Sequence, residues 1–187
     1  IDWVQAPVMN VGKTHTNGFD WTIDMGFPIY KEVLKGSVGW QNNWLLTLES
    51  RLKKNHDWDE PDNNSEGYFA PDNMAGTISY ASASLARWRW LANMDIGGSW
   101  WTVSNRVRFI QGAKIYGTDY TYPTTKTPNV AYWDLVGSIN WKGLDFIVGM
   151  DNVLDKDPPF LPTTGSNTNL YTYDAMGRYF YARVGYQ

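Results

Sequence analysis

The sequence of 187 residues predicts an all-β fold, and more narrowly the wall of an antiparallel transmembrane β-barrel. Apolar and polar residues alternate along about seven segments, and a period of two belongs to a strand with two different faces. Aromatic residues make up 16% of the chain, including 11 Trp and 12 Tyr, which concentrate where an apolar surface meets water. Short and long connections alternate between the segments, as they do in outer-membrane barrels.

The first four strands are predicted near residues 16–27, 37–52, 84–96 and 101–109. In each of them, large apolar side chains occupy alternate positions, and the positions between carry mostly Asp, Arg, Asn, Gln, Thr or Ser. This pattern indicates one face against hydrocarbon or a core and one face in water. The apolar positions are Phe19, Trp21, Ile23, Met25 and Phe27, then Val38, Trp40, Trp44, Leu46 and Leu48, then Trp88, Trp90, Ala92, Met94 and Ile96, then Trp101, Val103, Val107 and Phe109.

The last three strands are predicted near residues 130–141, 144–151 and 178–187. The terminal strand has the clearest alternation of the three, because its apolar face is almost continuous. That face carries Phe180, Ala182, Val184 and Tyr186, whereas Tyr179, Arg183 and Gln187 share the other. A strand with so apolar a face needs a cover of lipid or of another sheet.

The connections define two sides of the predicted sheet. Those after the first, third and fifth strands are short, at 28–35, Gly97-Gly98 and Lys142-Gly143, and a two-residue turn with Gly is a hairpin signal. Those after the second, fourth and sixth strands are long and polar, at roughly 53–83, 113–129 and 155–177. In outer-membrane barrels tight turns face the periplasm and long loops face outward, so Gln187 is expected on the periplasmic side.

A soluble β-sandwich also alternates apolar and polar residues, and it is the main structural alternative. The distribution of aromatic residues favours lipid, because they lie near strand ends as in the aromatic girdles of barrels. Trp101, Trp141 and Tyr186 are expected near one rim, and Trp133, Phe109 and Phe180 near the other. An odd count of seven strands cannot close an ordinary bacterial barrel, so residues 1–187 are expected to be the C-terminal portion of a larger barrel domain.

Composition excludes several other classes of protein. No apolar run approaches the roughly 18 residues that a membrane-spanning helix needs. A net charge of −3 and a pI near 5.3 argue against a nucleic-acid partner, and the lack of Cys excludes disulfides and Cys-ligated metals. His15 and His56 are the only histidines, and nothing near them suggests a nucleophile with its base. We therefore expect neither an enzyme nor a cofactor.

Two segments near the C-terminus resemble the end of TonB-dependent outer-membrane receptors: residues 151–159 (DNVLDKDPP) and 173–180 (YDAMGRYF). Residues 10–14, 18–20 and 87–90 are similar to that family's barrel as well. The resemblance implies a barrel of 22 strands closed by an N-terminal plug domain. It also implies active uptake of a scarce ligand, such as a siderophore, cobalamin or a saccharide, with energy relayed by TonB. The plug domain and the TonB box are not in this sequence, so both are implied partners, along with the ligand and outer-membrane lipid.

A lumen charge network is predicted on the polar faces of the third and fourth strands. A turn at Gly97-Gly98 would place Arg89 opposite Arg106 and Arg87 opposite Arg108. Like charges in opposing positions destabilise a sheet, so Glu49 and Asp134 are expected as counter-charges. Asp134 is also expected opposite Asp151, across the Lys142-Gly143 turn. These charges are predicted to form salt bridges with the wall or the plug, and direct contact with an anionic ligand is the alternative.

Aromatic residues in the long loops are the candidate ligand-binding residues, because their rings can stack on sugars or on aromatic siderophores. They are Trp58, Tyr68, Tyr116, Tyr120, Tyr122 and Tyr171, and packing within the loops is the alternative role. The acids of residues 57–66 suggest oxygen ligands for Ca²⁺, but Pro61 interrupts their spacing and the Gly of a calcium loop is absent. A solvated loop without a metal is expected there. Other outer-membrane barrels, such as an enzyme or an adhesin, and a soluble carbohydrate-binding sandwich remain the functional alternatives.

Overall fold

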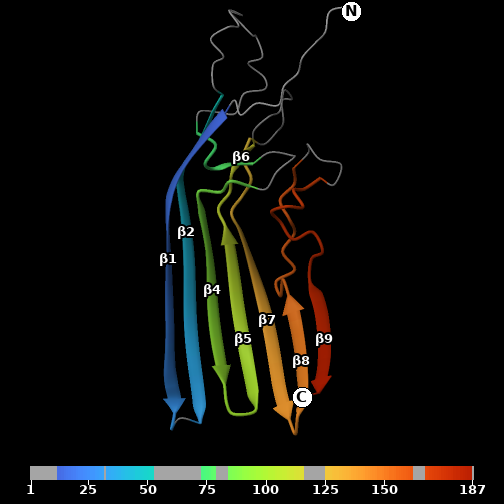
Figure 1. The fold of residues 1–187 in the computed structure, drawn as a ribbon. Helices are drawn as coiled ribbons and strands as arrows, with labels where there is room; N and C mark the ends of the chain where they lie inside the picture. The colour runs from blue at the N-terminus through green and yellow to red at the C-terminus, as the bar shows by residue number, and fades with distance from the viewer. Residues whose placement is uncertain are drawn as a thin grey trace, which may run out of the picture.

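Seven strands form one antiparallel sheet whose spatial order follows the chain (Figure 1). The computed structural model describes residues 12–31, 33–52, 73–78, 84–115, 125–161 and 167–186, without the side chains of 12–14 and 49–52. No helix occurs in these ranges. The strands of the sheet are β1 (Gly12–Tyr30), β2 (Leu34–Leu52), β4 (Trp88–Gly97), β5 (Trp101–Ile110), β7 (Val130–Trp141), β8 (Leu144–Asp151) and β9 (Tyr179–Tyr186).

The all-β fold and the seven predicted strands are therefore confirmed. The main differences are in length, since β1 and β2 each run for 19 residues and extend beyond their predicted ends. Two further strands, β3 (Thr77–Ile78) and β6 (Lys114–Ile115), pair with each other in parallel. Each has only two residues, which is too short for any alternation to be visible in the sequence.

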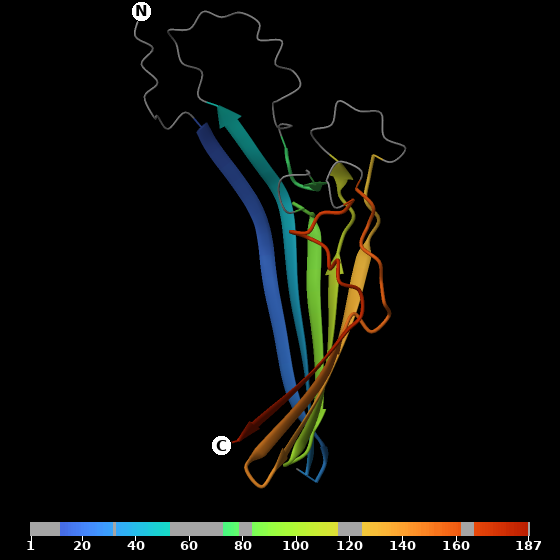
Figure 2. The same cartoon turned by 90° about the vertical axis from the view of Figure 1, so that its right-hand side faces the viewer.

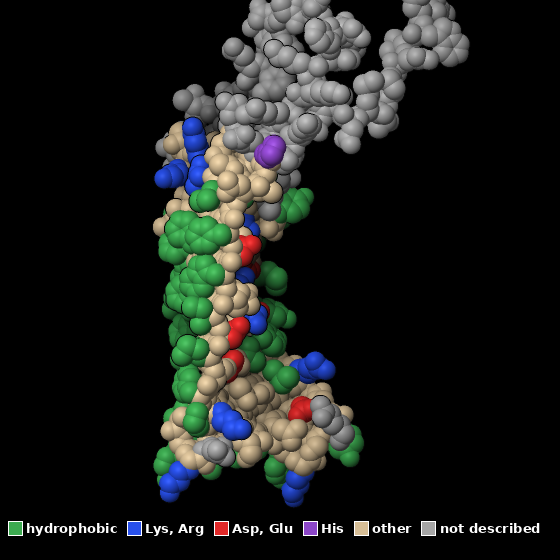
Figure 3. All heavy atoms as spheres, turned by 60° about the vertical axis from the view of Figure 1, so that its left-hand side comes forward, with side chains coloured by type: hydrophobic (Ala, Val, Ile, Leu, Met, Phe, Trp, Pro, Cys, Tyr) green, Lys and Arg blue, Asp and Glu red, His purple; other side chains and the backbone are tan. Residues whose placement is uncertain are grey.

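The two faces of the sheet differ in chemistry, because successive side chains of a strand point to opposite sides. We call the face that carries Phe19, Ile23 and Met25 the apolar face; these three side chains are 51%, 51% and 57% exposed. The opposite side, which carries Asp24, Arg106 and Asp134, is the polar face. Figure 3 shows apolar side chains along one side of the sheet and charged ones toward the other. Within the described ranges no second sheet packs against the apolar face, and the two-stranded sheet of β3 and β6 packs at one end of the polar face.

Aromatic rings stack across three neighbouring strands on the apolar face. Trp40 and Trp90 have ring centroids 4.9 Å apart, Trp44 and Trp88 5.1 Å, and Trp90 and Phe109 5.3 Å. Contacts at such distances between offset rings stabilise a sheet beyond the area that they bury. The apolar face is therefore an ordered aromatic layer over β2, β4 and β5.

Two asparagines interrupt the apolar face and accept hydrogen bonds from indole groups. Trp88 Nε1 donates to Asn42 Oδ1 at 2.7 Å, and Trp133 Nε1 donates to Asn105 Oδ1 at 3.3 Å. Asn42 is 5% exposed beneath the surrounding rings, and its Nδ2 has no acceptor among the described residues. A polar atom without a hydrogen-bond partner is costly in an apolar environment. The two asparagines therefore give the indole N–H groups the acceptors that apolar side chains cannot provide.

The short connections all lie at one end of the sheet, which we call the short-turn end, and the long ones at the other, which we call the loop end (Figures 1 and 2). Lys142 and Gly143 have φ of 52° and 82°, as a two-residue hairpin turn of type I′ requires. This turn is the predicted one, and the predicted division into short and long connections is confirmed.

The predicted turn at Gly97-Gly98 is wrong. Gly98 N donates to Trp101 O at 2.9 Å, so the turn between β4 and β5 is centred on Ser99 and Trp100. Every pair of the two strands is therefore displaced by four residues, and Arg89 lies opposite Ile110 instead of Arg106. The glycines do not adopt the positive φ that marks a turn; a Cβ on Gly97 would instead crowd the backbone of β5. An even displacement keeps each side chain on its predicted face.

The predicted alternation also fails near the end of β2. The register shifts between Asn17 and Gly18, where Leu46 is the extra residue of a β-bulge. Beyond the bulge, Leu48 pairs with Thr16 and Glu49 with His15. Because a one-residue slip reverses the two faces, the backbone register removes Leu48 from the predicted apolar row.

A small core lies at the loop end, where the connections fold against the polar face. It consists of the buried residues Ile78, Ala113, Val130, Tyr132, Leu161 and Tyr173. Val130 and Tyr132 share the polar side of β7 with Asp134, so this end of the polar face is covered by the loops while its middle is open. The loop end therefore has the packed core of the structure.

Gly149 gives a test of the packing between β8 and β9. It lies opposite Tyr181, whose ring occupies the space that a Cβ on Gly149 would take. We expect Gly149→Ala to lower the free energy of unfolding by about 1–3 kcal/mol through overpacking. The matched control is Gly137→Ala, because a Cβ there meets only Val148 Cγ2 at 3.8 Å. Urea unfolding followed by tryptophan fluorescence measures both, and equal stabilities of the two variants would contradict the assigned packing.

Candidate functional site on the polar face

A hollow of about 570 Å³ lies in the middle of the polar face and draws its lining from all seven strands. The charged residues of its wall are four acids and one arginine: Asp24, Asp95, Asp134, Asp151 and Arg106. Ser37, Asn93, Ser104 and Tyr181 add groups that donate and accept hydrogen bonds. The hollow is thus a polar, mainly acidic trough along the sheet.

Asp134 and Arg108 form the strongest interaction beside this trough. Arg108 Nε lies 2.9 Å from Asp134 Oδ2, and Arg108 Nη2 donates to Asp134 Oδ1 at 3.1 Å, so the pair is bidentate. Asn152 N also donates to Asp134 Oδ1, at 3.0 Å. Asp134 is 7% exposed, and these three donors compensate the removal of its carboxylate from water.

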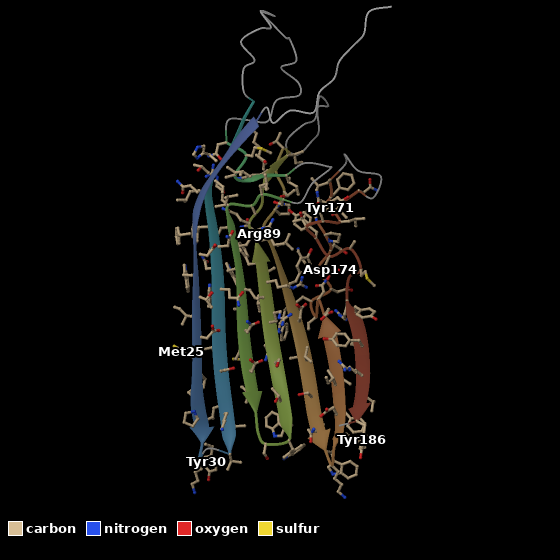
Figure 4. The ribbon with its side chains drawn as sticks, viewed as in Figure 1. Met25, Tyr30, Arg89, Tyr171, Asp174 and Tyr186 are labelled. Atoms are coloured by element: carbon tan, nitrogen blue, oxygen red, sulfur yellow. The ribbon has the colours of Figure 1, made fainter. Side chains whose placement is uncertain are left out.

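The same arginine connects the strands to the last long loop. Its guanidinium lies 5.2 Å from the centre of the Tyr132 ring, and its Nη2 lies 3.9 Å from Asp174 Oδ2. Asp174 N donates to the Tyr132 hydroxyl at 3.2 Å. Arg108 therefore joins β5, β7 and the loop around Asp174, which Figure 4 places at the upper end of β8 and β9.

The two segments that carry the family resemblance lie side by side in the structure. Asp155 Oδ1 accepts a hydrogen bond from Arg178 N at 2.8 Å, and Arg178 Nε donates to Val153 O at 3.0 Å. Asn152 has a φ of 51° and is fully buried, and its side chain bonds the backbone of Lys156 in both directions, at 2.8 and 3.0 Å. Asn tolerates this left-handed conformation better than most residues, which explains its place directly after β8.

The predicted pairing of arginines across β4 and β5 is wrong. Arg106 pairs with Asn93 and with Asp134 across the sheet, and Arg108 pairs with Leu91 and Tyr132, so no two arginines oppose each other. Arg87 precedes β4 and donates from Nη1 to Leu46 O at 2.7 Å, whereas Arg89 Nη2 donates to Ser84 O. The displaced turn is the reason, and it relieves the repulsion that the predicted pairing carried.

One of the predicted charge relations is confirmed. Asp134 is the counter-charge of an arginine, as expected, although its partner in a salt bridge is Arg108. Asp151 and Asp134 both line the trough, and the paired register of β7 and β8 ends one residue before them, at Leu135 and Met150. The side chain of Glu49 lies outside the described residues, and its backbone pairs with His15 as given above.

A second polar cluster lies at the loop end around Tyr173. The Tyr173 hydroxyl donates to Thr127 Oγ1 at 3.1 Å inside the small core. Burial raises the pKa of Tyr173, while the hydrogen bond to Thr127 and the positive charge of Arg89 oppose that rise. The phenol therefore stays neutral at physiological pH and acts as a hydrogen-bond donor that fixes the loop.

The predicted ligand-binding residues belong to the long connections between strands. Trp58, Tyr68, Tyr116, Tyr120 and Tyr122 lie outside the described residues, as do His56 and the acids of 57–66. Tyr171 is described, at the loop end, and it is 74% exposed (Figure 4). The described ranges contain no group of three side chains placed to hold a metal ion. They also contain no helix with the length and hydropathy to span a membrane.

No protein-family model, no curated protein and no solved structure matches this chain.

Several residues of the site were not predicted from the sequence, among them Tyr132, Asn152, Asp174 and Tyr181. Asn152 and Asp174 belong to the segments that carry the resemblance, so their position could have drawn attention to them. Tyr132 and Tyr181 give no such signal, because a tyrosine on a strand is ordinary unless its neighbours are known. Together these residues make a site that can hold a charged or hydrogen-bonding segment against the polar face.

The two arginines of β5 give a matched test of the site. Arg108→Gln leaves the buried Asp134 without its bidentate partner, so we expect the free energy of unfolding to fall by about 2–3 kcal/mol. Arg106→Gln is the control, because Arg106 is exposed and forms no ion pair within the described structure; its effect should stay within about 0.5 kcal/mol. Urea unfolding measures the stability of both variants. Equal losses of unfolding free energy would contradict the assigned difference between Arg108 and Arg106.

Proposed function

We propose that this chain is the C-terminal part of the barrel wall of a TonB-dependent outer-membrane transporter. The observation that carries the proposal is the sheet itself: seven antiparallel strands with one uncovered apolar face and one charged face. Transfer of each large apolar side chain from water to hydrocarbon lowers the free energy by roughly 1.5–3 kcal/mol. Lipid on the apolar side accounts for residues such as Phe19, Met25 and Val148, which no other described element covers.

Strand lengths support this reading. A transmembrane strand needs roughly 9–11 residues when it is tilted. β4 and β5 have ten residues each and β7 has 12, which suits a single crossing. β1 and β2 have 19 residues, so this hairpin would project beyond the membrane at the loop end. Trp101 and Trp141 lie at the short-turn end of their strands, where an aromatic girdle would meet the headgroups.

The edges of the sheet support a larger barrel. β1 and β9 each have a neighbour on one side only within the described residues. Unpaired backbone groups cost several kcal/mol each in hydrocarbon, so strands from outside this sequence would complete the wall. We propose 22 strands in total, a number that comes from the resemblance of residues 151–159 and 173–180 to TonB-dependent receptors.

In this proposal the polar face lines the interior, with the C-terminus on the periplasmic side. Arg108, Asp134 and Asp174 fix the last loop to the wall, and the acids and Arg106 of the trough remain available to a plug domain. The loop end takes part in the capture of a scarce ligand, such as a siderophore, cobalamin or a saccharide. Uptake draws its energy from TonB through the part of the protein that precedes this sequence.

Location and energy dependence test the proposal on the full-length protein in cells. We expect the protein in the outer-membrane fraction, with migration on gels that changes on heating. Uptake of one probe among a labelled ferric siderophore, cobalamin and a maltooligosaccharide should rise with expression and disappear on addition of a protonophore or deletion of TonB. A porin in the same cells is the control, because diffusion through it needs no energy.

Three outcomes would contradict the proposal at different points. Extraction without detergent would indicate a soluble sandwich. An outer-membrane location with no uptake of any probe would favour a barrel with another role, such as an enzyme or an adhesin. Uptake that persists without TonB would leave a transport barrel and remove the energy coupling.

A further inference from the structure

Three lysines lie at the short-turn end of the sheet, on connections that are far apart in the sequence. Lys31 lies in the turn between β1 and β2, Lys35 near the start of β2, and Lys142 in the turn between β7 and β8. All three are exposed, and within the described structure none of them forms an ion pair. Figure 3 shows Lys and Arg side chains at the tips of this end of the molecule.

Two of these lysines lie over aromatic rings of the same rim. Lys31 Nζ is 5.4 Å from the centre of the Tyr30 ring, and Lys142 Nζ is 5.0 Å from the centre of the Trp141 ring. The rings are 60% and 58% exposed. An amphipathic ring beside a long aliphatic stem that ends in a cation is the arrangement that places both groups at a boundary between hydrocarbon and water.

The acids nearest to this rim along the strands lie on the polar face, where they accept hydrogen bonds from neutral side chains and form no ion pair with the three lysines within the described structure. Ser37 Oγ donates to Asp95 Oδ2 at 3.1 Å, and Asn140 Nδ2 donates to Asp145 Oδ1 at 2.5 Å. Glu32 follows Lys31 in the sequence and lies outside the described residues. The three lysines therefore concentrate positive charge at one end of a chain whose net charge is −3.

We propose that this basic rim, formed by Lys31, Lys35 and Lys142 with Tyr30 and Trp141, binds the anionic phosphate headgroups of the membrane leaflet at the short-turn end. The inference rests on the proposed function, since it requires the sheet to be inserted in a membrane. The turns of β1–β2 and β7–β8 are four strand spacings apart, or about 19 Å. A layer of phosphates reaches all three cations at once, whereas a small anion could not bridge the two turns.

Anionic lipid should stabilise the folded protein through this rim. Each lysine at an anionic surface adds a factor of about five to the folding equilibrium constant, so three add roughly 100-fold. Added salt should reduce this gain, because the interaction is exposed to solvent.

The test is the urea unfolding of the full-length protein in vesicles of phosphatidylcholine alone or mixed with phosphatidylglycerol. The test variant carries Lys31→Gln, Lys35→Gln and Lys142→Gln. The matched control carries Lys114→Gln, Lys126→Gln and Lys156→Gln, three exposed lysines of the loop end. We expect phosphatidylglycerol to stabilise the natural protein and the control by the same factor, and the gain to disappear in the test variant.

The outcomes separate this inference from the proposed function. A test variant that keeps the full gain, or a control that loses it equally, would overturn the basic rim. A natural protein that folds equally well in both vesicles would overturn it as well, while leaving the barrel intact. A natural protein that inserts into neither vesicle would overturn the proposed function instead. Equal stability of the test variant and the natural protein in phosphatidylcholine shows that the substitutions do not disturb the fold.

Discussion

The alternation of side chains across one continuous antiparallel sheet is the constraint on which the rest of the structure depends. The backbone N–H and C=O groups of the inner strands form hydrogen bonds with the neighbouring strands. The chemistry of each face of the sheet therefore depends on its side chains alone. One face then becomes an aromatic and aliphatic surface, and the other a polar trough. Because no second layer covers the apolar side within the described residues, the usual soluble solution of one sheet packed on another is not seen.

The polar residues on the apolar face follow from the same constraint. Asn42 and Asn105 lie where only apolar side chains are expected, and each accepts a hydrogen bond from an indole N–H. Trp is useful on such a face because it is large, but its N–H needs an acceptor that hydrocarbon cannot provide. An asparagine on the neighbouring strand supplies that acceptor. The two asparagines therefore stabilise the aromatic layer although they interrupt its apolar pattern.

On the polar face, Asp134 and Arg108 connect the strands with the connections at the loop end. Asp134 receives hydrogen bonds from β5 and from the residue after β8, and Arg108 reaches toward Asp174 in the last loop. These contacts continue into the small core around Tyr132 and Tyr173. The loop end is thereby fixed to the sheet, whereas the short-turn end has tight turns with exposed lysines and aromatic rings. This polarity along the strands underlies the proposed orientation in a membrane.

The sequence by itself determined the seven strands of the large sheet, their faces outside the end of β2, and the division into short and long connections, because a period of two and the length of each connection are local properties. The turn of Lys142 and Gly143 was local as well, and it fixed the register of β7 against β8. Only the tertiary structure decided the partner of each arginine, since the turn at Ser99 and Trp100 displaced β4 against β5 by four residues and the pairing with β7 brought Arg108 to Asp134. The bulge at Leu46 was equally invisible, because one extra residue in a strand shows only against the register of its neighbour.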